Sequence, residues 1–180
     1  MDCITQPPPI NAVLAALDYA YPWSGLISRY KFADQTGWAS FFGAVLFNAH
    51  GVSQALQSAR LILPVPLSKE RLQTRGFNQA WELASALAQQ SGCTAKTDST
   101  LLLRVKNTRP QTELLRQERL ANVRGAFVVD PLRAQVLKGQ RVILVDDVMT
   151  SGASLYTAAQ ALRAAGATHI TGLILARTPL

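Results

Sequence analysis

The sequence predicts an α/β fold in which a parallel sheet is flanked by helices. Two strand–loop–helix units, residues 60–92 and 141–166, each pair an apolar run with a helical pattern across a short polar loop. Further strand-like and helix-like segments alternate with them over residues 59–180. Such alternation is typical of a parallel sheet that helices cover on both faces.

The clearest unit begins at Arg141. Val142–Val145 are β-branched or aliphatic, as in a strand that is buried on both faces. Asp146 and Asp147 follow at its carboxyl end, and a small hydroxyl-rich turn comes next. Beyond the turn, apolar residues recur at i, i+3, i+4 and i+7, which predicts a helix with one apolar face: Leu155, Ala158, Ala159 and Leu162.

The turn between this strand and this helix predicts an anion site. The first N–H groups of a helix have no partner within the helix, and the helix dipole favours negative charge there. Thr150, Ser151 and Ser154 add hydroxyl donors, and Gly152 lets the backbone approach a ligand. The two carboxylates suit sugar hydroxyls or a metal ion carried by the ligand. A phosphate cradle beside such acids indicates a ribose phosphate, whereas the alternative is a strand edge with two solvated acids.

The second unit carries a basic loop. Its strand, residues 60–66, ends in prolines, and Lys69, Arg71 and Arg75 follow before a helix that ends at Gly92. Ligands of open α/β sheets bind at the carboxyl ends of the strands, so this loop and the acidic loop should face one site. A cationic loop there would grip a pyrophosphate group, and the alternative is a solvated basic turn.

The remaining segments are assigned more coarsely. Residues 1–11 form an arm stiffened by consecutive prolines, and residues 1–58 make an N-terminal arm and hood ahead of an α/β core at 59–180. We expect strands at 12–21, 101–105, 126–129 and 170–175, and helices after Asp34 and at 113–122. The hood holds most of the aromatic residues, which either pack in the core or, for one or two of them, stack on a base.

Composition limits the class of protein. A chain of 180 residues with 48% hydrophobic residues suits one domain, with or without a small appendage. No apolar run reaches the length of a membrane span, and we expect no secretory signal, since the first residues lack a basic segment followed by an apolar one. Two distant cysteines, Cys3 and Cys93, indicate a reducing, cytoplasmic location without a disulfide framework or a structural zinc site. A net charge of +7 agrees with polyanionic partners.

The acidic loop resembles the phosphoribosyl-pyrophosphate (PRPP) signature of type I phosphoribosyltransferases, from the apolar strand through the Asp-Asp pair to the Thr-x-Gly turn. More widely, the chain resembles the ComF family, phosphoribosyltransferase-like proteins that are linked to DNA uptake in competence and related to GntX-type proteins. The matching positions are Leu26-Ile27 with Lys31-Phe32, Pro64–Leu67 with Arg75–Gln79, and Thr108, Gln111, Leu114, Arg119 and Asn122 before Ala126-Phe127. ComF-like proteins usually begin with a four-cysteine zinc ribbon, of which only Cys3 is present here, so zinc binding is not carried over.

The resemblance implies a type I phosphoribosyltransferase fold with a small N-terminal hood that selects the acceptor. It also implies roles for matching residues. Asp146 and Asp147 would meet the ribose hydroxyls and stabilise positive charge on the ring, as the catalytic pair. The 5-phosphate would lie against the loop Met149, Thr150, Ser151, Gly152, Ala153 and Ser154. The pyrophosphate and its Mg²⁺ would meet Val65, Pro66, Leu67, Ser68 and Lys69, helped by Arg71 or Arg75. A flap that closes over the site would contain Arg104, Lys106, Thr108, Arg109 and Gln111.

The acceptor cannot be read from the sequence, and no residue stands out as a general base. His50 and His169 are expected at the surface or in packing positions. The first hypothesis is a PRPP-binding phosphoribosyltransferase with Mg²⁺ brought by PRPP and no metal site of its own. The second is a non-catalytic module that senses PRPP or a nucleotide, or that handles single-stranded DNA in transformation; a third is a base-salvage enzyme. Candidate partners are PRPP or another ribose phosphate, single-stranded DNA, competence or recombination proteins, and a second copy of the chain.

Overall fold

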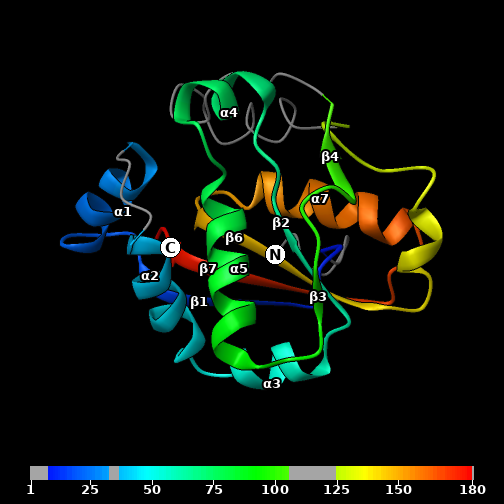
Figure 1. Cartoon of the computed structure of the whole chain (residues 1–180), viewed down its shortest axis with the longest axis horizontal. Coiled ribbons are helices and arrows are strands. Elements are labelled where there is room, and N and C mark those ends of the chain that lie inside the picture. The colour runs from blue at the N-terminus through cyan, green and yellow to red at the C-terminus, as the bar shows by residue number, and fades with distance from the viewer. Residues whose placement is uncertain (1–7, 33–36, 106–124, 180) are drawn as a thin grey trace.

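The computed structural model describes residues 8–32, 37–105 and 125–179 (Figure 1). Its centre is a five-stranded sheet in the order β1-β7-β6-β2-β3, and every neighbouring pair is parallel. The strands are β1 (Ala12–Asp18), β2 (Leu61–Pro64), β3 (Lys96–Thr97), β6 (Arg141–Met149) and β7 (His169–Arg177). The predicted α/β class with a helix-flanked parallel sheet is confirmed.

The alternation of side chains along the central strands divides the core into two layers. Val142 and Leu144 of β6 point into one hydrophobic cluster, whereas Ile143 and Val145 point into the other. Helix α7 (Ala153–Ala164) covers the first face. The second face is covered by α1 (Trp23–Phe32), α2 (Gly37–Phe47), α3 (Val52–Ser58) and α5 (Gln79–Ser91), and Figure 1 shows α5 on the near side of the sheet. Burial on both faces explains why β6 reads as a continuous apolar run.

A small antiparallel pair, β4 (Leu102–Arg104) and β5 (Phe127–Val129), lies beside this sheet. Leu103 faces Val128 across the pair, and a short 3-10 helix, η2 (Ala134–Leu137), follows. The predicted strands at 101–105 and 126–129 are confirmed. The predicted helix at 113–122 and the flap residues Lys106, Thr108, Arg109 and Gln111 lie outside the described residues.

The segment after β2 differs from the prediction. Residues 69–75 were expected as a basic loop, but they form helix α4 (Lys69–Arg75). The Ser68 hydroxyl accepts a hydrogen bond from the Arg71 amide at 3.4 Å, which caps the first turn. Gly76 ends the helix in the left-handed conformation, with φ of 80°. Since no α4 residue is buried, the segment has no apolar periodicity from which a helix could be predicted.

The N-terminal segment contributes directly to the sheet. The predicted strand at 12–21 is shorter than expected, since β1 ends at Asp18, and it pairs with β7 at the sheet edge. Helix α1 was not predicted; it follows the Tyr21-Pro22 peptide bond, which is cis. Helices α1 and α2 then lie at one end of the sheet, on the left in Figure 1. Among the described residues, no helix is both long and apolar enough to cross a membrane.

Candidate functional site

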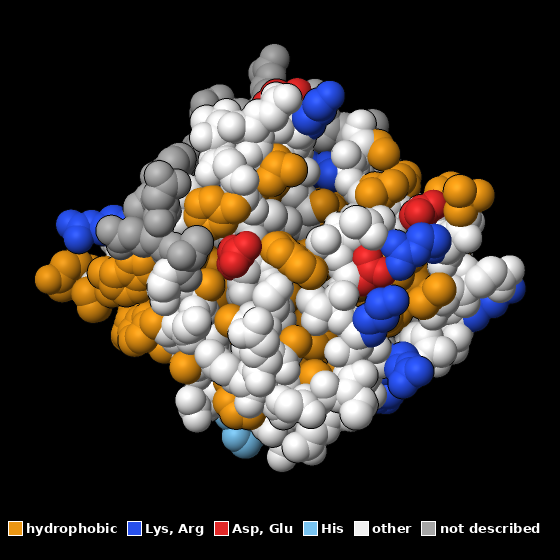
Figure 2. All heavy atoms as spheres, viewed as in Figure 1, with side chains coloured by type: hydrophobic (Ala, Val, Ile, Leu, Met, Phe, Trp, Pro, Cys, Tyr) orange, Lys and Arg blue, Asp and Glu red, His pale blue; other side chains and the backbone are white. Residues whose placement is uncertain are grey.

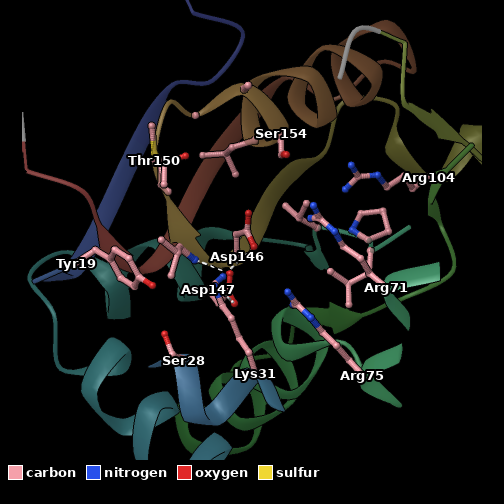
Figure 3. A pocket seen from close by; sticks show the side chains of 18 of the residues that line it. Tyr19, Ser28, Lys31, Arg71, Arg75, Arg104, Asp146, Asp147, Thr150 and Ser154 are labelled. Atoms are coloured by element: carbon pink, nitrogen blue, oxygen red, sulfur yellow. Dashed lines mark hydrogen bonds and ion pairs between the residues drawn. The ribbon is translucent and has the colours of Figure 1, made fainter. Parts of the chain in front are cut away.

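A pocket of about 560 Å³ opens at the carboxyl ends of β2 and β6 (Figure 3). Loops from β2 and β6 contribute to it, together with α1, α4, β4 and the start of α7. The predicted site residues that line it are Val65, Pro66, Leu67, Arg71, Arg75, Arg104, Asp146, Asp147, Met149, Thr150, Gly152, Ala153 and Ser154. Ser68, Lys69 and Ser151 are not among the lining residues: Ser68 caps α4, and the Ser151 hydroxyl accepts from the Ala153 amide at 3.4 Å.

The acid pair, Asp146 and Asp147, lies within β6 rather than beyond its end, because the strand continues to Met149. The Asp146 carboxylate accepts from the Asp147 amide at 2.9 Å, and the Asp147 carboxylate accepts from the Val148 amide at 2.7 Å. These bonds fix both side chains at the floor of the pocket. Burial, and then the charge of Asp147, raise the pKa of Asp146 from 3.8 to about 8.

Gly152 lets the turn after β6 close tightly against α7. It caps this helix with φ of 75°, in the left-handed region that glycine tolerates best. A Cβ atom at this position would lie 2.7 Å from Met149 Cε and 2.8 Å from Tyr156 Cε2. Gly152, Ala153 and Ser154 therefore bring the N-terminus of α7 to the pocket wall, where the helix dipole favours an anion.

Cationic side chains form one side of the pocket, which we call the arginine side: Arg71 and Arg75 of α4 and Arg104 of β4. Figure 3 shows all three extending towards the acid pair. The Arg104 guanidinium lies 5.3 Å from the centre of the Phe127 ring. Burial and the neighbouring Arg71 guanidinium lower the pKa of Arg104 below its ordinary value. Three guanidinium groups in one wall are suited to several phosphate oxygens.

The opposite wall, which we call the lysine side, consists of Tyr19, Ser28 and Lys31 (Figure 3). The Lys31 ammonium lies 3.2 Å from Asp147 Oδ2 and 6.0 Å from the centre of the Tyr19 ring. The acid pair thus lies between cations on both walls. No specific site role was predicted for any of these three residues, although the aromatic hood that contains them was expected to select the acceptor. The resemblance at Leu26-Ile27 and Lys31-Phe32 was the available signal, but nothing local indicated that Lys31 reaches Asp147.

Other lining residues also escaped prediction: Glu70, Thr74, Val148 and Leu155. His50 and His169 do not line the pocket, in agreement with their predicted placement. Among the described residues, no group of three or more His, Cys, Asp or Glu side chains could hold a metal ion.

Comparison with known proteins identifies the family. A family model described as the phosphoribosyl transferase domain matches residues 74–179. The DNA utilization protein YhgH of Salmonella typhi is 33% identical over 98% of this chain and 76% of its own length. Competence protein F of Haemophilus influenzae is 31% identical over 98% of the chain and 77% of its own length. The chain belongs to the ComF family of phosphoribosyltransferase-domain proteins.

Two further matches cover less of one chain or the other. Competence protein ComFC of Bacillus subtilis is 31% identical over 84% of this chain and 58% of its own length. Among solved structures, the allosteric regulatory enzyme of purine biosynthesis matches with a TM-score of 0.47 and 19% identity, over 77% of this chain. The ComF chain spans only 25% of that much longer enzyme.

Proposed function

We propose that this ComF-family chain binds PRPP with Mg²⁺ in the pocket and acts as a phosphoribosyltransferase-type protein linked to DNA uptake. The observation that carries the proposal is the arrangement around the acid pair. A helix N-terminus, two carboxylates and three guanidinium groups line one cavity of about 560 Å³. Each matches one part of PRPP: the 5-phosphate, the ribose hydroxyls and the pyrophosphate.

Different pocket residues would contact different parts of PRPP. The turn from Thr150 to Ser154 would hold the 5-phosphate, and the acid pair would accept hydrogen bonds from the ribose hydroxyls. On transfer, the bond from ribose C1 to the pyrophosphate oxygen breaks and a bond from C1 to the acceptor forms. The electron pair leaves with the pyrophosphate, whose charge the arginine side would stabilise. Catalysis would be mainly positioning plus electrostatic stabilisation.

The pocket residues also fit Mg²⁺ brought by the substrate. This ion is usually held by one or two carboxylates together with substrate phosphates and water, and the pocket offers the carboxylates of Asp146 and Asp147. When bound, it would neutralise negative charge on the pyrophosphate group. The lysine side remains for the acceptor, because it faces the acid pair from the wall opposite the arginines.

Thermal unfolding with and without ligand tests this proposal. A ligand at about 100 times its Kd stabilises a protein by about 2.7 kcal/mol, which for a domain of this size is equivalent to about 5–11 °C in Tm. We expect such a shift with millimolar PRPP and Mg²⁺, a smaller one with ribose 5-phosphate or pyrophosphate alone, and none with an unphosphorylated ribose. An unchanged Tm with PRPP, under conditions where the parent unfolds reversibly, would contradict the proposal.

A second candidate function is the handling of single-stranded DNA. It is supported by the names of the relatives, DNA utilization protein and competence protein, and by the net charge of +7. On the face drawn in Figure 2, Lys and Arg side chains gather towards the side of the molecule that carries the segment after β5. A steep fall of DNA affinity with salt is expected if these cations contact phosphates. Absence of binding at low salt would remove this candidate.

A further inference from the structure

One motif of the sequence is not explained by the proposed function, namely Arg75-Gly76-Phe77-Asn78-Gln79, which joins α4 to α5. The structure gives each residue a separate contact. Gly76 ends α4, and the Phe77 ring lies 6.2 Å from the Tyr30 ring of α1. The Asn78 side chain accepts from the Ala80 amide at 3.0 Å and donates to the Val65 carbonyl at 3.2 Å. The motif therefore connects the loop after β2 with the N-terminal helices.

Gln79 lies at the centre of these connections and is only 1% exposed. Its Oε1 accepts from Arg75 Nη1 at 2.9 Å, and its Nε2 donates to the Lys31 carbonyl at 3.3 Å. Its own backbone carbonyl accepts from the Tyr30 hydroxyl at 3.0 Å. Burial raises the pKa of Tyr30, so this hydroxyl keeps its proton and remains a donor.

A buried amide is costly unless its polar atoms are paired, and an apolar side chain of similar size would fill this space without that requirement. The amide of Gln79 reaches residues on both walls of the pocket. Arg75 lies on the arginine side and Lys31 on the lysine side. One buried side chain thus links the guanidinium of Arg75 to the backbone of Lys31, the residue whose ammonium pairs with Asp147.

We propose that Gln79 is a positioning residue that fixes the Arg75 guanidinium relative to the end of α1 that carries Lys31. The proposal rests on the proposed function, because it assigns Arg75 to the pyrophosphate and Lys31 to the acceptor wall. Holding the Arg75 guanidinium and the α1 backbone at Lys31 through one amide would fix the distance between the leaving-group wall and the acceptor wall. It would also keep the Arg75 guanidinium directed into the pocket before the ligand binds. Preorganised cations bind an anion more tightly because less ordering is needed on binding.

The test replaces Gln79 by Met, which keeps the length of the side chain but removes both hydrogen bonds of the side-chain amide. Gln90→Met is the matched control, since Gln90 lies on the same helix and donates to the Ser40 carbonyl at 2.9 Å, away from the pocket. For PRPP with Mg²⁺, we expect Gln79→Met and Arg75→Met each to raise Kd about 10-fold. The double variant should raise Kd little further than either single variant. Both substitutions remove the same contribution, namely a guanidinium of Arg75 that is directed into the pocket. Gln90→Met should leave Kd unchanged.

Two outcomes would overturn the inference while leaving the proposed function intact. One is a Gln79→Met variant that is less stable but binds PRPP as tightly as the parent. The other is a double variant whose loss is the product of the two single losses, since the two residues would then act independently.

A second readout needs no ligand and separates this inference from the proposed function. In the unliganded chain, Gln79→Met should speed amide hydrogen exchange in the last turns of α1 and α4, where Lys31 and Arg75 lie, and Gln90→Met should not. Unchanged exchange in both turns would refute the positioning role even if the parent fails to bind PRPP. Failure of the parent to bind PRPP, with faster exchange in Gln79→Met, would refute the ligand assignment alone.

Discussion

Replacement of Asp146 by Asn should stabilise the fold above neutral pH while removing the ribose site. The substitution keeps an oxygen that can accept the hydrogen bond from the Asp147 amide, which is 2.9 Å long in the parent. It removes a charge that is buried beside a second carboxylate. The expected gain in stability therefore comes from electrostatics and not from repacking.

The size of the effect follows from the pKa. Burial and the charge of Asp147 raise the pKa of Asp146 from 3.8 to about 8, so the folded state binds more protons than the unfolded chain between these values. The free energy of unfolding must then fall as pH rises through this range. Each pKa unit is equivalent to about 1.4 kcal/mol. Because water reaches the open pocket and relaxes part of the cost, we expect a loss of about 2–3 kcal/mol between pH 5 and pH 8.5.

Urea denaturation of the parent and of Asp146→Asn at pH 5 and pH 8.5 measures this difference. The two proteins should be closest in stability at the lower pH, and the variant should be more stable by about 2–3 kcal/mol at the higher pH. Asp18→Asn, at the exposed end of β1 and not among the residues that line the pocket, controls for a general loss of negative charge. Stability differences that are the same at both pH values would refute the electrostatic reasoning.

Three further predictions follow from other contacts. Gly152→Ala should lower the free energy of unfolding by about 1–3 kcal/mol, measured by urea denaturation, because it places a side chain at φ of 75° with its Cβ only 2.8 Å from the Tyr156 ring. An unchanged stability would show that the turn can relax. Burial alone would raise the pKa of Asp98, but hydrogen bonds from Arg133 and Thr100 lower it to about 2. The stabilisation that the Asp98 carboxylate provides is therefore present above about pH 4 and lost as pH falls towards 2. In Asp98→Asn, the free energy of unfolding measured by urea denaturation should depend less on pH over this range. Finally, affinity for PRPP with Mg²⁺ should rise from pH 6.5 to pH 8.5 in calorimetric titrations, since the acid pair must lose its proton to bind; affinity that falls over this range would contradict that role.

The parts of the fold that could be predicted are those whose burial leaves a local pattern. Strand β6 is buried on both faces and reads as an apolar run, and α7 follows with one apolar stripe and a glycine cap. Helix α4 has no buried residue, so its sequence carries only the cap at Ser68 and no periodicity. Helix α1 buries only Ile27 and Tyr30 among its described side chains, which is too short a stripe to predict a helix.

The same distinction applies to the site. The turn from Thr150 to Ser154 is contiguous, so its chemistry could be inferred from spacing alone. The ion pair of Lys31 with Asp147 and the hydrogen bond of Gln79 to the Lys31 carbonyl join residues far apart in the chain. They depend on how α1 and α5 pack against β6, and local sequence does not specify that packing. Contacts of this kind become visible only when the elements are assembled.

The central claim is that the acid pair and the turn after it form a working site for PRPP. Calorimetric titration of PRPP with Mg²⁺ into the parent, Asp146→Asn/Asp147→Asn and Thr150→Ala tests it most directly. The account predicts micromolar binding by the parent, equivalent to about −8 kcal/mol, and loss of the binding heat in both variants. Parent and variants with the same affinity would place the ligand elsewhere, and no binding by the parent at millimolar PRPP would contradict the claim.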